Sequence, residues 1–232
     1  VFCYFKGSRV KIRYLIVKWN DVLIEPRDIP KLRGFFLTQF PENHLFHNHL
    51  PGQQYSYKFP QIQYRIIDKH PALLAINDAI GVVKQVFLEV GKLELNGKTI
   101  ISNEREMILR EEDFGQTEDY YNYYFASPWM ALNQENYNTY NKLDTYNKNQ
   151  KLKTILKNNL KTLSKAFQYW IPDLDNLNVD GWFHPLEVNF HNQPMLCFTG
   201  DFTTNFLIPE FLGLGKQSAR GFGVVRKKEE KL

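Results

Sequence analysis

Cysteine and long apolar runs are scarce in this 232-residue chain. The two cysteines, Cys3 and Cys197, lie far apart, and the sequence holds no Cys-x-x-Cys pair. Such usage argues against a disulfide framework and against a cysteine-ligated metal site, and it favours two reduced thiols in a cytoplasmic protein. No apolar run approaches the roughly 18 residues that a membrane helix needs, so we expect no membrane partner.

Aromatic side chains and a mild positive charge are what the chain has instead. It contains 13 Tyr and 18 Phe, 43% of its residues are hydrophobic, and its formal net charge is +4. A chain of this length and composition can bury a substantial core, as one large domain or two small ones. The charge permits a nucleic-acid partner without requiring one, and exposed Tyr rings can stack on bases.

The first half of the chain alternates between strand and helix patterns. Alternating apolar positions, helical spacing and cap residues predict strands at 9–19, 57–67 and 72–76 and helices at 28–40 and 77–91. Asn96-Gly97, between two short apolar runs, indicates a hairpin. The resulting order β-α-β-β-α-β is that of a ferredoxin-like unit.

The second half repeats this order of elements without a detectable sequence repeat. Its predicted elements are a strand at 120–130, a long helix from about 136 to 170, a hairpin of 183–190 with 195–199, a short helix at 207–212 and a strand at 222–226. We therefore predict an α+β fold of two tandem ferredoxin-like (RRM-like) βαββαβ domains. The predicted domains are residues 1–118 and 119–232.

The long predicted helix is basic. Residues 145–172 contain six Lys and no acidic residue, and Lys153, Lys157, Lys161 and Lys165 recur every four residues. That spacing places the four on one side of the helix. A solvated helix face is the plainer interpretation, and a surface that follows an RNA backbone is the alternative.

A glycine-rich segment near the end of the chain, Gly213-Leu-Gly-Lys-Gln-Ser-Ala-Arg-Gly-Phe-Gly223, holds four glycines and two cations. Glycine permits φ > 0, and successive N–H groups in such a turn suit phosphate oxygens. A dinucleotide site needs a strand before the loop and a helix after it, which is the reverse of the predicted order, and no Gly-Lys-Ser/Thr run closes a P-loop. A hinge that binds nothing is the alternative.

This segment resembles the glycine-rich loop of the RAMP proteins of CRISPR systems, most of all the endoribonucleases that cut CRISPR precursor RNA at its repeats. A second resemblance lies upstream, in Leu45-Phe-His-Asn-His49 followed by Tyr57-Lys-Phe-Pro-Gln-Ile-Gln-Tyr-Arg65. Two matches in the expected order are more specific than either alone. Residues 93–181 carry no matching motif.

The resemblance implies an activity and its partners. It implies a metal-independent endoribonuclease with no cofactor, in which the 2′-hydroxyl of CRISPR repeat RNA attacks the adjacent phosphate. The products would be a 2′,3′-cyclic phosphate and a 5′-hydroxyl. Effector-complex subunits are further expected partners, and the protein is expected to be a monomer or a homodimer. A non-catalytic RNA-binding subunit of an effector complex is the alternative.

The resemblance also implies site residues. It places a catalytic histidine in the His-rich turn, at His47 or His49, and histidine suits acid and base work near neutral pH. His44 stays open as a further candidate, and Tyr57 and Lys58 are candidates near the cleaved phosphate. The RNA-binding candidates are Arg33, Gly213, Gly215, Lys216, Gln217, Ser218, Arg220, Gly221 and Gly223.

These candidate residues also have alternative interpretations. His44, His47 and His49 can bind zinc with Glu42 as the fourth ligand, or they can lie in solvent at a helix end. Arg33 can be an exposed helix charge. The polar side chains of the 57–67 strand, Gln61, Gln63 and Arg65, can contact RNA or belong to a half-buried strand.

Overall fold

The structure is a computed structural model that describes residues 9–47, 59–190 and 192–229. Its contacts divide into two compact units. The first, which we call the N-terminal unit, consists of Arg13–Glu111 together with Ala219–Gly221, and the second, the C-terminal unit, comprises the other described residues. The strands β1 (Val10–Trp19) and β6 (Arg105–Phe125) contribute residues to both units. The predicted domain boundary after residue 118 stays a prediction.

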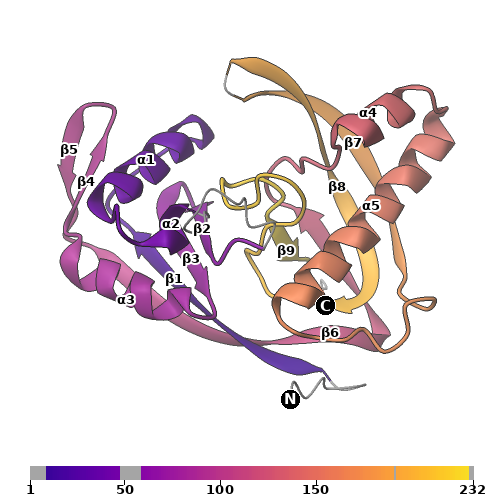
Figure 1. Ribbon diagram of the computed structural model, residues 1–232, viewed down its shortest axis with the longest axis horizontal. Coiled ribbons are helices and arrows are strands. Elements are labelled where there is room, and N and C mark those ends of the chain that lie inside the picture. Colours follow the sequence, from indigo (N-terminus) through magenta and orange to yellow (C-terminus); the bar gives the residue numbers. More distant parts are fainter. Residues whose placement is uncertain (1–8, 48–58, 191, 230–232) are drawn as a thin grey trace. The chain divides into compact units, whose positions relative to one another are not determined.

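The N-terminal unit has a βαββαβ order (Figure 1), but its fourth strand is the start of β6 and not the hairpin at 92–102 with which the predicted order ended. Besides β1 and the start of β6, it contains a single 3₁₀ turn η1 (Pro26–Asp28), α1 (Ile29–Gln39), α2 (His44–His47), β2 (Ile62–Ile67), β3 (His70–Ile76) and α3 (Ala79–Glu89). The strand order is β2-β3-β1-β6, and β3 runs antiparallel to both β2 and β1. Each helix therefore links two strands that have another strand between them, which is the ferredoxin-like arrangement.

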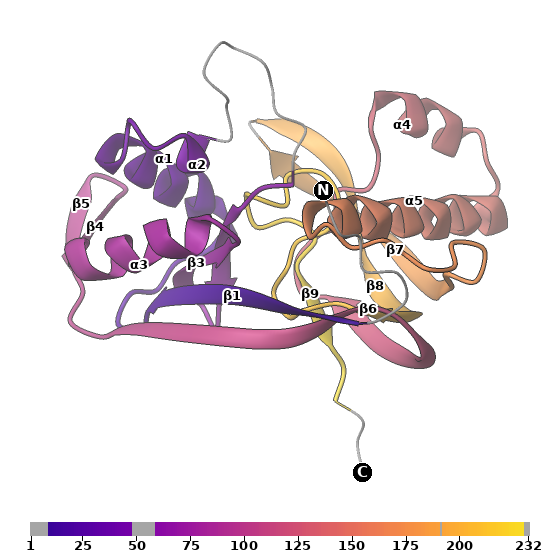
Figure 2. The same cartoon turned by 60° about the horizontal axis from the view of Figure 1, so that its bottom comes forward.

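Alternation along the strands produces the core of this unit. Leu15, Val17 and Trp19 of β1 point to one face of the sheet, where they pack with Leu32 of α1 and Val83 of α3. All five side chains are at most 1% exposed. Burying each large apolar side chain contributes about 1.5–3 kcal/mol. The apolar stripes predicted from helical spacing are thus the faces that attach α1 and α3 to the sheet (Figure 2).

The predicted hairpin is confirmed as β4 (Lys92–Leu95) and β5 (Lys98–Ile101). Asn96 and Gly97 both have positive φ, at +55° and +71°, which is what a two-residue turn between twisted strands requires. The Asn96 side chain also donates a hydrogen bond to Asp28 Oδ1 at 3.1 Å. The hairpin tip is therefore tied to the start of α1.

The C-terminal unit is built on the second half of β6. It adds α4 (Gln134–Asn141), α5 (Thr145–Ala166), β7 (Val179–Phe190), β8 (Gln193–Leu207) and β9 (Val225–Lys227). The strand order is β9-β6-β8-β7, with all pairs antiparallel. Asn149 of α5 donates to the Gly181 carbonyl of β7 at 2.9 Å, and α5 lies along this sheet in both views (Figures 1 and 2).

The long helix predicted from residue 136 to 170 is two helices. Asp144 lies between them and caps α5, because its side chain accepts a hydrogen bond from Asn147 N at 2.9 Å. The predicted apolar stripe is confirmed on α5, where Leu152, Leu156 and Leu160 are buried. None of the helices in the described part of the chain is long and apolar enough to span a membrane.

The short helix predicted at 207–212 is wrong. Strand β8 continues to Leu207, and Ile208 N then donates to the Tyr123 hydroxyl at 3.1 Å. Phe211 has φ +65°, and its N–H donates to the Val225 carbonyl at 3.0 Å. The N–H groups of Ile208 and Phe211 are thus satisfied by residues of β6 and β9 rather than by a helix. The α+β fold class of two ferredoxin-like units is confirmed. The C-terminal unit lacks the second helix that was predicted at 207–212.

Candidate nucleic-acid interface

The first part of the glycine-rich segment packs around Trp129 in the C-terminal unit. Gly215 has φ +81°, and a Cβ at this position would lie 2.6 Å from Trp129 Nε1. Gly223 has φ +62°, and a Cβ there would lie 2.0 Å from the Leu214 carbonyl oxygen. These two glycines therefore permit a close backbone approach that no other residue allows.

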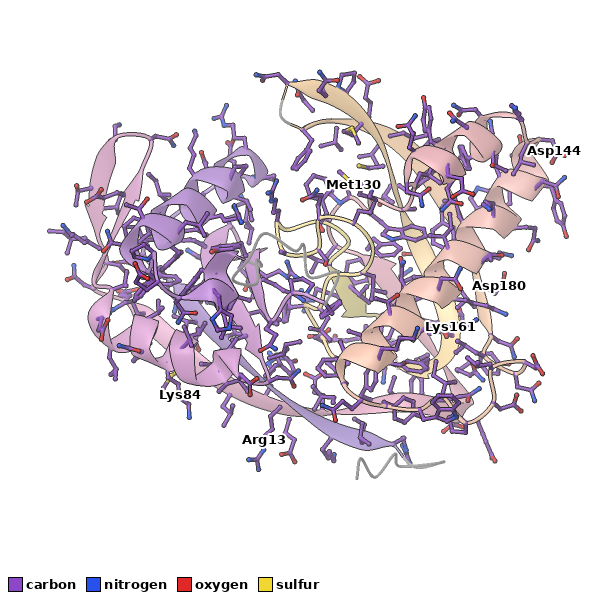
Figure 3. All side chains as sticks on the ribbon, viewed as in Figure 1. Arg13, Lys84, Met130, Asp144, Lys161 and Asp180 are labelled. Atoms are coloured by element: carbon purple, nitrogen blue, oxygen red, sulfur yellow. The ribbon has the colours of Figure 1, made fainter. Side chains whose placement is uncertain are left out.

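Backbone hydrogen bonds hold this part of the segment in place. Leu214 N donates to the Gly223 carbonyl at 2.9 Å, and Gly213 forms a bridge with Val224. Lys216 N donates to the Met130 carbonyl at 3.0 Å, and Figure 3 labels Met130. The Lys216 side chain is exposed. Of the other predicted RNA-binding residues here, Gln217 has φ +57° and Ser218 is buried.

The second part of the segment belongs to the N-terminal unit. Tyr64 N donates to the Ala219 carbonyl at 2.8 Å, and Arg220 forms a parallel bridge with Tyr64. Since β2 is the outer strand of its sheet, Ala219–Gly221 extends that sheet at its edge. Gly221 has φ +83°, and a Cβ there would lie 3.0 Å from Ile29 Cδ1. The segment thus runs past the first residue of α1.

This arrangement brings two predicted RNA-binding arginines into one electrostatic environment. Arg33 lies one turn beyond Ile29 on α1. Partial burial lowers the pKa of the Arg220 guanidinium, and the positive charge of Arg33 lowers it further. Two neighbouring cations that repel each other in a half-buried setting are stabilised when an anion binds between or beside them. The pair therefore suits a phosphate group.

Tyr64 joins this cluster, although sequence reasoning did not single it out. Its side chain is 1% exposed, and its hydroxyl has no hydrogen-bond partner within the described part of the chain. Burial raises the pKa of Tyr64, and the Arg33 charge opposes that rise. We refer to Arg33, Tyr64 and Arg220 as the arginine cluster. The pairing of β2 with residues 219–221 forms it, and that pairing leaves no local signal in the sequence.

Neighbouring residues of β2 have a different role. Gln63 and Arg65 are fully buried, and Arg65 donates hydrogen bonds to the Gln63 side chain and to the Tyr64 carbonyl. Complete burial lowers the pKa of the Arg65 guanidinium. These two side chains are interior groups, so their interpretation as surface contacts to RNA is wrong.

The His-rich turn begins as α2, which is attached to α1 by aromatic packing. Phe46 is 1% exposed and stacks on Phe36 and Phe40 of α1, with ring centroids 5.9 and 5.1 Å apart. His44, at the start of α2, is exposed. The helix that carries Arg33 therefore also anchors the turn in which we predict the catalytic histidine.

The predicted catalytic set lies mostly outside the described residues. His47 is the last residue of α2, and only its backbone position is described. His49, Tyr57 and Lys58 fall between residues 48 and 58, outside the described ranges. Within those ranges no cluster of three or more His, Cys, Asp or Glu side chains suits a metal ion. The zinc alternative of Glu42, His44, His47 and His49 stays untested, because it includes residues beyond those ranges.

The lysine stripe of α5 is partly engaged by the unit itself. Lys153 Nζ lies 2.6 Å from Asp180 Oδ1 at the start of β7. Lys161 lies two turns further along α5 than Lys153, and Figure 3 labels both Asp180 and Lys161. Asp144 at the N-cap and Lys165 in the last turn both complement the helix dipole. Two of the four stripe lysines, Lys153 and Lys165, thus have structural roles that do not involve RNA.

Comparison with known proteins identifies the class and then the family. A chain of two ferredoxin-like units with a glycine-rich segment near its end has the RAMP fold. The model of the Cas6b N-terminal domain matches residues 10–113, and the model of the Cas6b C-terminal domain matches residues 115–228. The chain belongs to the Cas6b family.

Individual relatives agree with this assignment. A crystal structure of Cas6b is 33% identical with a TM-score of 0.88, and the match covers 94% of this chain and 100% of that one. A structure described as CRISPR RNA processing endoribonuclease Cas6b is 31% identical with a TM-score of 0.77 and the same coverage. An uncharacterised protein of Methanocaldococcus jannaschii is 32% identical over 146 residues, which are 63% of this chain and 99% of that protein.

Proposed function

We propose that this protein is an endoribonuclease that cleaves CRISPR repeat RNA to release guide RNAs, without a metal ion. Membership of the Cas6b family supports this, as does a 31% identical relative described as a CRISPR RNA processing endoribonuclease. The observation that carries the proposal is the arginine cluster, in which Arg220 neighbours Arg33 of the helix that anchors the His-rich turn.

The chemistry needs few groups. The 2′-hydroxyl of one nucleotide loses its proton and attacks the adjacent phosphorus, and the P–O5′ bond breaks. The products are a 2′,3′-cyclic phosphate and a 5′-hydroxyl. We assign His47 or His49 to the proton transfers, and Tyr57 and Lys58 to the charge on the phosphate oxygens.

RNA positioning falls to the residues that the structure describes. Arg33 and Arg220 hold a backbone phosphate, and the exposed Lys216 is a further cation of the glycine-rich segment. Holding the 2′-hydroxyl, phosphorus and leaving oxygen in line supplies much of the rate enhancement. The glycines contribute by letting the backbone on either side of Lys216 and Arg220 adopt its close-packed path.

The test is cleavage of the cognate repeat RNA in excess EDTA, beside a copy with one 2′-deoxy substitution at the cut site. We expect only the all-RNA strand to be cut, leaving a cyclic phosphate. His47→Ala and His49→Ala separate the two histidines, because the true catalytic residue loses cleavage and keeps RNA affinity. Cleavage that EDTA abolishes would contradict the mechanism and favour zinc. Tight binding without cleavage would favour a non-catalytic RNA-binding subunit.

A further inference from the structure

A row of side chains crosses the sheet of the C-terminal unit on the face opposite its aromatic core. Trp182 of β7 pairs in register with Asp201 of β8, and Asp201 pairs with Tyr124 of β6. Directly paired residues project from the same face of a sheet. The adjacent residues Phe183 and Phe202 project from the other face and are buried. Trp182, Asp201 and Tyr124 therefore form one row across three strands.

A cavity of about 280 Å³ opens on this face. Trp182 and Tyr124 line it together with His184, Thr199 and Asp201. Its volume lies just below the usual range for drug-sized ligands, so it suits one flat ring system such as a single nucleobase. Trp182 is 50% exposed, so much of its indole faces the solvent rather than the core.

The backbone beneath the cavity is held firmly. Gly200 has φ +143°, and a Cβ at this position would lie 2.3 Å from the Trp182 carbonyl oxygen. Strands β7 and β8 thus approach more closely here than a larger residue would permit. Lys228 Nζ lies 2.5 Å from Asp201 Oδ2 and orients that carboxylate. Binding to such a preorganised surface costs less free energy, because fewer protein groups have to be ordered when the ligand binds.

Cations border the row on the side of β9. Arg226 pairs in register with Tyr124 and therefore lies on the face of the row, whereas Lys227 pairs with Tyr123 on the core face. Lys228 follows directly and reaches the row through its carboxylate partner. An aromatic surface beside cations is the combination that proteins use for single-stranded nucleic acid, with bases on the rings and phosphates near the charges.

We propose that this face, centred on Trp182, binds an unpaired nucleotide of the RNA that the protein processes. The inference rests on the proposed function and adds a second RNA contact to it. The base stacks on the Trp182 indole inside the cavity, and the neighbouring phosphates lie toward Arg226 and Lys228. Asp201 accepts hydrogen bonds from the edge of the base. A carboxylate only accepts, and the amino group of cytosine, adenine or guanine offers it two N–H donors against the single N3–H of uracil, so the site favours the bases that carry an amino group.

The first test measures affinity without cleavage. The full-length protein is titrated into fluorescein-labelled repeat RNA that carries a 2′-deoxy substitution at the cut site, and anisotropy reports Kd. Trp182→Ala should weaken binding about 5- to 150-fold, the range for losing one base–aromatic stack. Trp182→Phe keeps a ring and should retain most of the affinity. Trp170→Ala is the matched control, because Trp170 is 55% exposed in the same unit, and it should bind as the wild type does.

The second test concerns base preference. Short oligocytidine should bind the wild-type protein more tightly than oligouridine of the same length, and Asp201→Asn should remove that difference because an amide also donates. Wild-type affinity in Trp182→Ala, or an equal loss in Trp182→Phe or in Trp170→Ala, would overturn the inference. Oligouridine binding as tightly as oligocytidine would overturn the role of Asp201.

The inference and the proposed function fail separately. If the all-RNA repeat is never cut but binding still depends on Trp182, the nuclease proposal fails and the nucleotide site stands. If the repeat is cut and Trp182→Ala binds it with wild-type affinity, the nucleotide site fails and the nuclease proposal stands.

Discussion

Gly215 and Gly223 show why the glycine-rich segment has its composition. Sequence reasoning assigned the glycines to a phosphate-binding turn, and the structure places these two against Trp129 and the Leu214 carbonyl. Gly221 lies against the end of the Ile29 side chain in the other unit. The glycines position the segment, whereas Lys216 and Arg220 carry its charge.

This role leads to a stability prediction for Gly223→Ala. The new methyl group would overlap the Leu214 carbonyl oxygen, and φ +62° would strain any L side chain. We expect the free energy of unfolding to fall by about 2 kcal/mol or more. The control is Gly81→Ala on α3, where a Cβ meets nothing within 4 Å and a gain of about 0.5–1 kcal/mol is expected. Urea denaturation measures both, and equal stabilities for the two variants would contradict this account.

The arginine cluster leads to a binding prediction. Arg33→Ala and Arg220→Ala should each weaken repeat-RNA binding about tenfold or more, since each removes a charge-assisted contact to phosphate. Each should also reduce the slope of log K against log salt by about 0.7. Arg27→Ala is the control, because Arg27 is exposed and its Nε lies 3.0 Å from Glu25. Salt titrations by anisotropy measure the slopes, and a loss equal to that of Arg27→Ala would argue against the cluster.

At the scale of elements, the start of α1 and the β4–β5 hairpin depend on one carboxylate. Asp28 accepts hydrogen bonds from Glu25 N at 3.1 Å, Asn96 Nδ2 at 3.1 Å and Lys31 Nζ at 3.3 Å. Burial raises the pKa of Asp28, but these hydrogen bonds outweigh it and the pKa is lowered overall. The charged form is therefore the one that holds the two elements together.

The sign of the resulting pH dependence follows from that lowered pKa. Asp28 contributes stability above its unfolded pKa, near 3.9, and this contribution is lost as the pH falls through the lower folded value. Asp28→Asn should cost about 1 kcal/mol at pH 7 and should flatten the decline in melting temperature below about pH 4. Asp78→Asn is the control, since its side chain makes no cap hydrogen bond at α3. Melting curves from pH 7 to 2.5 measure both variants, and parallel curves would contradict the prediction.

Element prediction succeeded where local periodicity and caps agree, and failed where long-range pairing decided. The stripe of α5 and the Asn96-Gly97 hairpin were predicted, because both signals lie within a few residues. The 207–212 helix was wrong, because Phe211 pairs its backbone with Val225 on a strand that comes later in the chain. Strand β6 begins at Arg105, whereas a strand was predicted only from residue 120. The prediction missed the first part of β6 because that part is charged and partly exposed.

At the scale of the whole molecule, the two units share chain segments. Strands β1 and β6 contribute to both, and Ala219–Gly221 leaves the second half of the sequence to extend the sheet of the first. Neither half of the chain, cut after residue 118, contains all the residues of one unit.

We therefore expect the separate fragments 1–118 and 119–232 to unfold at lower urea concentration than the full chain. The full chain should unfold in one transition, because β6 cannot lose its pairing in one unit without disturbing the other. Far-ultraviolet circular dichroism and tryptophan fluorescence test this, since Trp19 and Trp129 are buried in different units. Two separate transitions, or fragments as stable as the full chain, would contradict it.

The sequence by itself determined most of the order of strands and helices, the glycine-rich segment and the His-rich turn, because propensity, periodicity and short motifs act over neighbouring residues. It also carried the resemblance that the family match confirms. Only the tertiary structure decided that Arg220 lies beside Tyr64 and Arg33, that Arg65 is interior, and that Trp182 lines an open cavity. Those facts depend on which strand edges pair and which sheet face is covered, and both are set by contacts between residues far apart in the chain.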